Sequence, residues 1–232
     1  MASSRREEKY ILDYRLYTLI RNRVSLVLQP DEHYAEGIYT VTSLYFDDPY
    51  KTAYYEKSDG LAVHTKFRVR SYDYQDSFLR LEKKTKQGLK TNKDSAVLSK
   101  TVLSKIADAP FVLEGFDNKV YPLAAEMQSK GLRPTVTVRY QREAFLMEGT
   151  DVRVTFDTRV EALPGDVDCL FDKNRIGIPA IHPANIIMEI KYNYKLPTLI
   201  RRLCSANAPQ LSVSKYALCV GDIRLPAGFV QD

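Results

Sequence analysis

The 232-residue chain is poor in residues that mark disulfide frameworks, metal centres and backbone phosphate cradles. Its three cysteines, Cys169, Cys204 and Cys219, are odd in number and lack metal-ligand spacing, which argues against a disulfide framework and a zinc site. The three histidines are scattered. Among only ten glycines there is neither a Gly-x-x-x-x-Gly-Lys loop nor a Gly-x-Gly-x-x-Gly turn. Bound phosphates would therefore be held by side chains.

Long apolar runs are also lacking. No stretch approaches the roughly 20 consecutive apolar residues that a membrane-spanning helix needs. The N-terminal residues Met1 to Arg6 are polar and have no apolar segment for secretion. We therefore expect a soluble, cytoplasmic protein, which could still dock on a membrane protein partner.

The composition is that of one globular domain spanning residues 1–232. Hydrophobic residues make up 44% of the chain and charged residues 27%, so disorder is not indicated. A chain of this length can bury a sizeable core. The net charge of +5 is moderate, and it matters only if the cations cluster on one surface.

Clustering is indicated by the segment Lys66-Phe67-Arg68-Val69-Arg70. In an extended strand, successive side chains point to opposite faces, so three cations share one face and two apolar groups the other. Similar alternation recurs around Arg80-Leu81-Glu82, Arg153-Val154-Thr155 and Met188-Glu189-Ile190. Strands are predicted over residues 5–11, 38–46, 62–72, 77–86, 135–142, 151–160 and 185–192. Helices are predicted after Asp13, over 95–107 and 120–130, and from Pro197, with a basic loop over 88–94.

A charged strand face often points to water while the other face packs on a core, and that reading stays open. The even repetition of charge favours an inward arrangement. We expect an α+β fold, in which an antiparallel eight-stranded β-barrel forms a tunnel with a polar, cationic lumen and helices pack outside.

Such a lumen would be self-repelling. Partly solvated like charges in close contact repel by ~1 to 4 kcal/mol per pair. The arrangement makes sense if the ligand is a polyanion, and mixed arginines and lysines suit a chain of phosphates. The two acids expected in the lumen, Glu82 and Glu189, are candidates for binding a divalent cation or orienting the basic side chains.

Eight motifs, in order, resemble the strand motifs of the VTC polyphosphate polymerase domain of the triphosphate tunnel metalloenzyme, or CYTH, superfamily. They span nearly the whole chain, which makes the set far more specific than any one motif. The motifs are Arg5-Arg6-Glu7-Glu8-Lys9-Tyr10, Ser43-Leu44-Tyr45-Phe46-Asp47, Lys66-Phe67-Arg68-Val69-Arg70, Leu81-Glu82-Lys83-Lys84-Thr85, Tyr140-Gln141-Arg142-Glu143-Ala144-Phe145, Arg153-Val154-Thr155-Phe156-Asp157, Met188-Glu189-Ile190-Lys191 and Ser214-Lys215-Tyr216.

The resemblance implies a metal-dependent polymerase that transfers the terminal phosphate of ATP to a growing polyphosphate chain. Mn or Mg would be the cofactor, bound by Glu189 and Glu7. The expected partners are ATP or another triphosphate and polyphosphate, without nucleic acid. Residues expected to act on the phosphates, as catalytic or substrate-binding groups, are Lys9, Lys66, Arg68, Arg70, Glu82, Lys84, Lys90, Lys93, Tyr140, Arg142, Arg153, Lys191, Ser214 and Lys215.

Two positions depart from the family pattern. The N-terminal signature Glu-x-Glu-x-Lys has Arg5 at its first glutamate position, leaving Glu7 and Lys9. Fewer carboxylates to bind metal and activate water favour transfer over hydrolysis. Ser212 stands where a lysine is expected in the eukaryotic domains, which would weaken the phosphate contacts there.

Two other functions remain possible. A triphosphatase would use the same tunnel to hydrolyse tripolyphosphate or a nucleoside triphosphate. A non-catalytic module would bind polyphosphate, inositol phosphates or RNA, although RNA readers present their aromatic side chains on an open face. The products formed from ATP separate these functions.

Overall fold

A computed structural model describes residues 5–31, 37–88, 90–108, 110–205, 208, 210 and 214–221. Ser212 and the side chain of Lys90, both named above, lie outside this part. The described chain is built on one antiparallel sheet. Its strands are β1 (Arg5–Leu12), β2 (Gln29–Pro30), β3 (Ile38–Asp47), β4 (Val63–Tyr72), β5 (Leu79–Gln87), β6 (Lys90–Leu98), β7 (Arg133–Leu146), β8 (Arg153–Pro164), β9 (Ile178–Pro179) and β10 (Ile186–Asn193).

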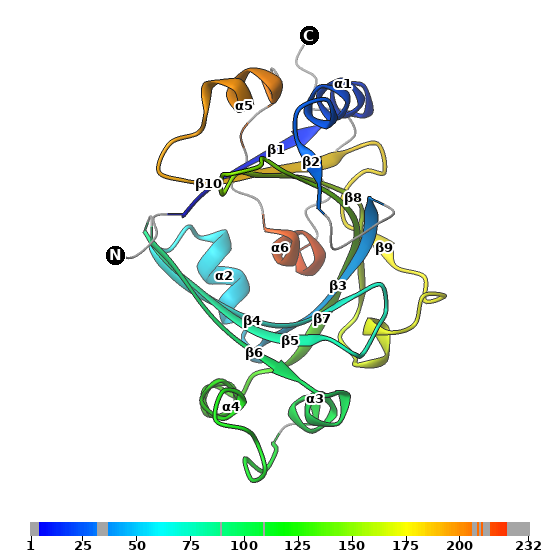
Figure 1. The fold of residues 1–232 in the computed structure, drawn as a ribbon. Coiled ribbons are helices and arrows are strands. Elements are labelled where there is room, and N and C mark those ends of the chain that lie inside the picture. The colour runs from blue at the N-terminus through cyan, green and yellow to red at the C-terminus, as the bar shows by residue number, and fades with distance from the viewer. Residues whose placement is uncertain are drawn as a thin grey trace.

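The main path through the sheet has the order β1-β10-β8-β7-β3-β4-β5-β6, and the short strands β2 and β9 pair with β7 and β8. The sheet curls strongly, as Figure 1 shows, so that its ends approach each other around a lumen. This confirms the predicted α+β fold with a tunnel-like antiparallel barrel. Among the described residues, backbone pairing does not join β1 to β6, but Lys84 of β5 forms an ion pair with Glu7 of β1 at 3.2 Å.

Four helices cover the outside of the sheet, as predicted. Helices α1 (Tyr14–Ser25) and α5 (Thr198–Leu203) lie over one side, and α3 (Lys100–Ala107) and α4 (Val120–Ser129) over the opposite side (Figure 1). Asp13 caps α1 by accepting a hydrogen bond from the Leu16 amide at 2.7 Å. In the described part of the chain, none of the helices is both long and apolar enough to cross a membrane.

Two helices differ from the expectation of helices outside. Helices α2 (Thr52–Ser58) and α6 (Lys215–Val220) lie within the curl of the sheet (Figure 1). They pack against each other so closely that a Cβ at Gly221 would lie 2.7 Å from the Tyr54 hydroxyl. The lumen is therefore bounded by both strands and helices.

Apolar residues of alternating strand positions form the core outside the lumen. Phe67, Val69 and Leu81 are buried beneath α3 and α4, together with Leu103 and Met127 of those helices. A second apolar cluster joins β8 and β10 to α1 and α5. Both clusters occupy the strand face opposite the charged side chains, as the alternation predicted.

The predictions for residues 90–98 were wrong. Residues 90–94 of the expected basic loop and residues 95–98 of the expected helix form β6. This strand pairs with β5 from Gln87–Lys90 to Leu79–Leu98. Only Lys100–Ala107 is helical, with Ser99 as its N-cap. The polar sequence at the start of β6 has no apolar alternation, so pairing with the edge of β5 overrides the local pattern.

Leu81→Ala tests the outer core. Leu81 is 0% exposed beneath α3 and α4, so removing its side chain leaves a cavity and should cost about 2–5 kcal/mol of unfolding free energy. Urea denaturation measures this value. Leu61→Ala, at a position 53% exposed, is the matched control and should change stability by less than about 0.5 kcal/mol. Equal effects of the two substitutions would contradict the assigned core.

Candidate functional site

The inner face of β4 carries the cations that the sequence predicted. Lys66, Arg68 and Arg70 point into the lumen, where Lys66 donates a hydrogen bond to Ser214 of the segment entering α6 at 2.8 Å. The intervening Phe67 and Val69 are buried in the outer core. Strand pairing places Lys66 opposite Lys84 and Arg68 opposite Glu82, so β5 continues the same charged surface.

A buried ion network occupies the side of the lumen formed by β7, β8, β10 and α6. Arg142 forms a two-point contact with Asp157 at 2.6 and 2.7 Å, and Lys215 reaches Asp157 at 2.6 Å and Glu189 at 2.8 Å. Burial would raise the pKa of Asp157, but Arg142 and Lys215 lower it. The carboxylate therefore stays ionised and ties α6 to the sheet.

Glu82 is the acid of a second network. It accepts a hydrogen bond from Arg68 at 2.7 Å and pairs with Lys93 of β6 at 2.5 Å. Burial would raise the pKa of Glu82, but Arg68, Arg70 and Lys93 lower it. Arg68 also donates to the Tyr45 hydroxyl at 2.9 Å. Glu82 thus fixes the position of two cations.

Two carboxylates flank Lys9 on β1. The Lys9 ammonium lies 3.1 Å from Glu7 and 3.8 Å from Glu189, and Lys191 lies 3.0 Å from Glu189. Burial would raise the pKa of Glu7, but Lys9, Lys191 and Lys84 lower it to about 2. Burial lowers the pKa of Lys191 to about 8, although Glu189 opposes the change.

Arg153 and Tyr140 complete the predicted set. Arg153 pairs with Asp31 at 2.7 Å and donates to the Tyr39 hydroxyl at 3.0 Å. The ring of Tyr140 lies 5.0 Å from both the Arg142 guanidinium and the Lys215 ammonium. Every predicted site residue whose side chain the structure describes therefore contributes to the inner surface or to its ion pairs.

Lys66 and Arg70 differ from the other described cations of the predicted set. Within the described residues, neither forms a salt bridge: Lys66 contacts Ser214, and Arg70 lies 3.4 Å from the Ser43 hydroxyl. Burial, together with Lys57, Lys9, Lys84 and Arg68, lowers the pKa of Lys66 to about 7. These two positions are where an anionic ligand would gain most.

The lumen holds two acids beyond the predicted Glu7, Glu82 and Glu189. Asp157, which the prediction left out of the site, is fully buried there, and Asp31 pairs with Arg153. The signal for Asp157 was present, because it follows Arg153 and Thr155 at strand spacing. The prediction also missed Lys57, which α2 brings close enough to affect Lys66. The cations still outnumber these acids.

The lumen carboxylates suit a divalent cation that shares its ligands with phosphates. Within the described residues, no group of three or more His, Cys, Asp or Glu side chains could hold a metal by itself. Mg²⁺ commonly uses one or two carboxylates, with substrate phosphates and water as the other ligands. Glu7 and Glu189, which share the Lys9 ammonium, fit that donor set.

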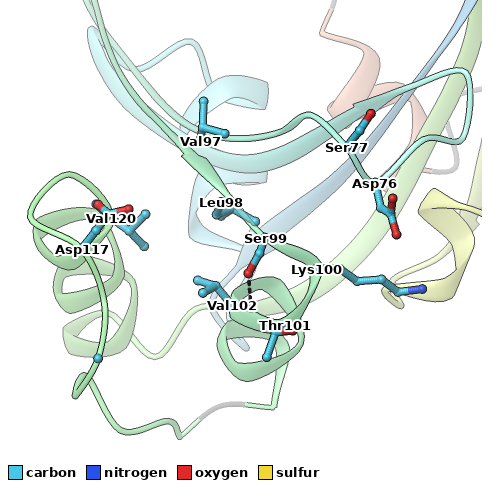
Figure 2. A pocket seen from close by; sticks show the side chains of 11 residues that line it. Asp76, Ser77, Val97, Leu98, Ser99, Lys100, Thr101, Val102, Asp117 and Val120 are labelled. Atoms are coloured by element: carbon cyan, nitrogen blue, oxygen red, sulfur yellow. Dashed lines mark hydrogen bonds between the residues drawn. The ribbon is translucent and has the colours of Figure 1, made fainter.

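A cleft of about 670 Å³ lies outside the lumen, between β6 and the starts of α3 and α4. Figure 2 shows Ser99 there, capping α3, with Asp76, Asp117 and Lys100 around the cleft. The Asp117 carboxylate already accepts hydrogen bonds from the backbone amides of Lys119 and Val120. With two acids and one lysine, the cleft lacks the cationic surface of the lumen.

Comparison with known proteins agrees with this geometry. A family model described as the VTC domain matches residues 4–222. No curated protein matches the chain. The structure of a candidate adenylate cyclase from Bacillus halodurans is similar in fold, with a TM-score of 0.50, 12% identity, and coverage of 84% of this chain and 81% of that one. Another, from Vibrio parahaemolyticus, has a TM-score of 0.46 and 10% identity, with coverage of 87% and 83%.

Asp157→Asn tests the buried network. The substitution keeps the shape of the side chain but leaves Arg142 and Lys215 without their main counter-charge, so unfolding free energy should fall by about 3–5 kcal/mol. Asp166→Asn is the control, because Asp166 pairs with Arg175 at the surface. This substitution should lower the unfolding free energy by less than about 1 kcal/mol. Denaturant unfolding at pH 7 compares them. Equal losses would show that the network does not stabilise the fold.

Proposed function

Because the chain belongs to the VTC domain family and has a triphosphate-tunnel-type fold, we propose that it is a metal-dependent polyphosphate polymerase. Its lumen binds ATP and transfers the terminal phosphate to a polyphosphate chain. The observation that carries this proposal is the inner cationic surface, in which Lys66 and Arg70 have no carboxylate partner among the described residues. Such a surface matches a row of phosphates better than a single carboxylate.

The basic side chains would act by holding both reactants and neutralising charge. A terminal oxygen of the acceptor chain attacks the γ-phosphorus, a new P–O–P linkage forms, and the bond to the β-phosphate oxygen breaks to release ADP. Arg68, Arg70 and Arg142 would stabilise the charge on the transferred group, since their positions are set by ion pairs and strand packing. No protein nucleophile is needed.

Glu7 and Glu189 would hold Mn²⁺ or Mg²⁺ together with phosphate oxygens. The bound cation would neutralise phosphate charge and help to align the triphosphate. Lys9 and Lys191 contact these carboxylates and keep them ionised. The two ammonium groups would also contact the phosphates beside the cation.

Transfer is favoured over hydrolysis by the state of the lumen carboxylates. A general base works best with a pKa near the working pH. Burial opposes ionisation of Glu7, Glu82, Asp157 and Glu189, but neighbouring cations lower all four pKa values. These acids are therefore weak bases for activating water, while a phosphate oxygen already carries the charge needed for attack.

Incubation with ATP and Mn²⁺ tests the proposed reaction directly. Polymerisation gives ADP and chains that resolve as a ladder on a gel. Orthophosphate without chains would instead identify a triphosphatase. Binding of tripolyphosphate with neither product would leave a non-catalytic binding module as the function.

Arg70→Ala should weaken tripolyphosphate binding by about 10- to 100-fold, the range for one or more hydrogen bonds to a charged group. Isothermal titration calorimetry measures the dissociation constant. Lys105→Ala removes a cation from the exposed surface of α3 and is the matched control. If Arg70→Ala bound tripolyphosphate like the control, Arg70 would not belong to the phosphate site.

Glu189→Gln should reduce turnover of ATP more than tripolyphosphate affinity. The substitution removes a candidate metal ligand but leaves the arginines that would bind phosphate. It introduces no negative charge that would repel the phosphates. A fall in kcat of at least about tenfold corresponds to 1.4 kcal/mol of lost transition-state stabilisation. Glu126→Gln on α4 controls for loss of an acid outside the lumen. Unchanged turnover in Glu189→Gln would exclude this role.

A further inference from the structure

The cationic inner face continues beyond the predicted phosphate site towards α2. Past Lys66, the next inward residue of β4 is His64, and strand pairing places His64 opposite Lys86 of β5. Helix α2 lies against β4 and brings Lys57 to the same end of the lumen. We call Lys57, His64 and Lys86 the mouth cluster. None of them belongs to the motifs on which the predicted site was based.

The mouth cluster brings basic side chains from the sheet and from α2 together. All three side chains are partly buried. His64 faces Lys86 across the two strands, whereas a pair of opposite charges at these positions would stabilise the sheet. At the next inward pair of strand positions, Lys66 faces Lys84 of β5, and Lys84 in turn faces Lys93 of β6. The nearby acid Glu56 accepts a hydrogen bond from the Thr65 amide at 3.3 Å instead. Within the described residues, no salt bridge involves His64 or Lys86.

Electrostatics at this end of the lumen supports a shared anion site. Burial lowers the pKa of His64, and Lys66, Lys57 and Lys86 lower it further, although the Leu61 carbonyl opposes the change. Burial, with Lys86 and Lys9, likewise lowers the pKa of Lys57. The charges of β4, β5 and α2 therefore act on one another across a small space, and an anion placed between them would relieve the repulsion.

The length of this surface decides the class of ligand. Inward residues of a strand are about 6.6 Å apart, so the row Arg70, Arg68, Lys66 and His64 spans about 20 Å. A triphosphate has only three phosphorus atoms and cannot reach from one end of that row to the other. A longer chain of phosphates can contact the central arginines and the mouth cluster together.

We propose that the mouth cluster is a chain subsite that binds phosphates beyond the third one of an extended polyphosphate. It rests on the proposed function and adds to it, because it gives the lumen a preference for long chains over triphosphates. The three side chains are half-buried and come from three elements, β4, β5 and α2.

Binding of two probes by the full chain tests this subsite. Calorimetry measures affinities for tripolyphosphate and for a longer linear polyphosphate at equal ionic strength. The parent should bind the longer chain at least about tenfold more tightly, as expected for one additional charged hydrogen bond or more. His64→Ala/Lys86→Ala should lose that preference and keep tripolyphosphate affinity within about threefold, which also shows that the variant is folded.

Lys105→Ala/Lys119→Ala is the matched control, because it removes two cations from exposed positions near α3 and α4. Its preference for the longer chain should equal that of the parent. If His64→Ala/Lys86→Ala kept the full preference, the chain subsite would be excluded and the proposed function would stand. If the parent failed to bind tripolyphosphate, the proposed function would itself be overturned, and the subsite with it.

Discussion

The ion network around Asp157 is the interaction on which the shape of the lumen depends. Asp157 is 0% exposed on β8 and contacts Arg142 of β7 and Lys215 of α6. Through Lys215 the same network reaches Glu189 of β10. It therefore joins three strands to α6, one of the two helices within the curl. Removing these charges from water is costly, and only their close pairing offsets that cost.

Strand alternation allowed most of the sheet to be predicted because it is a local property. Each inward residue of β4 could be assigned from the two-residue period alone, and the structure places the apolar partners in the outer core. β6 escaped prediction because its first residues are polar, and only pairing with β5 makes them a strand. The inward positions of α2 and α6 likewise depend on contacts between distant segments, which no local pattern encodes.

The candidate site was predictable to the same extent. Side chains on alternating strand positions could be named before the structure, and Asp157 could have been added by the same rule as Arg153. Lys57 could not, because its place in the lumen depends on how α2 packs. Pairing between cations and acids was also beyond local reasoning: the acids that hold Arg68 and Arg142 come from neighbouring strands.

The partial pairing of charge explains how so many cations can share one lumen and how that lumen could bind the proposed polyanion. Glu82 and Asp157 hold Arg68 and Arg142 in place, so those guanidinium groups lose little freedom when a ligand binds. Burial and the neighbouring cations lower the pKa of Lys66 to about 7, so its repulsion of the other lumen cations falls above that pH. A bound phosphate chain would stabilise the charged ammonium and raise this pKa again. Proton uptake by Lys66 would then accompany binding near neutral pH and would link the charge of the lumen to its proposed ligand.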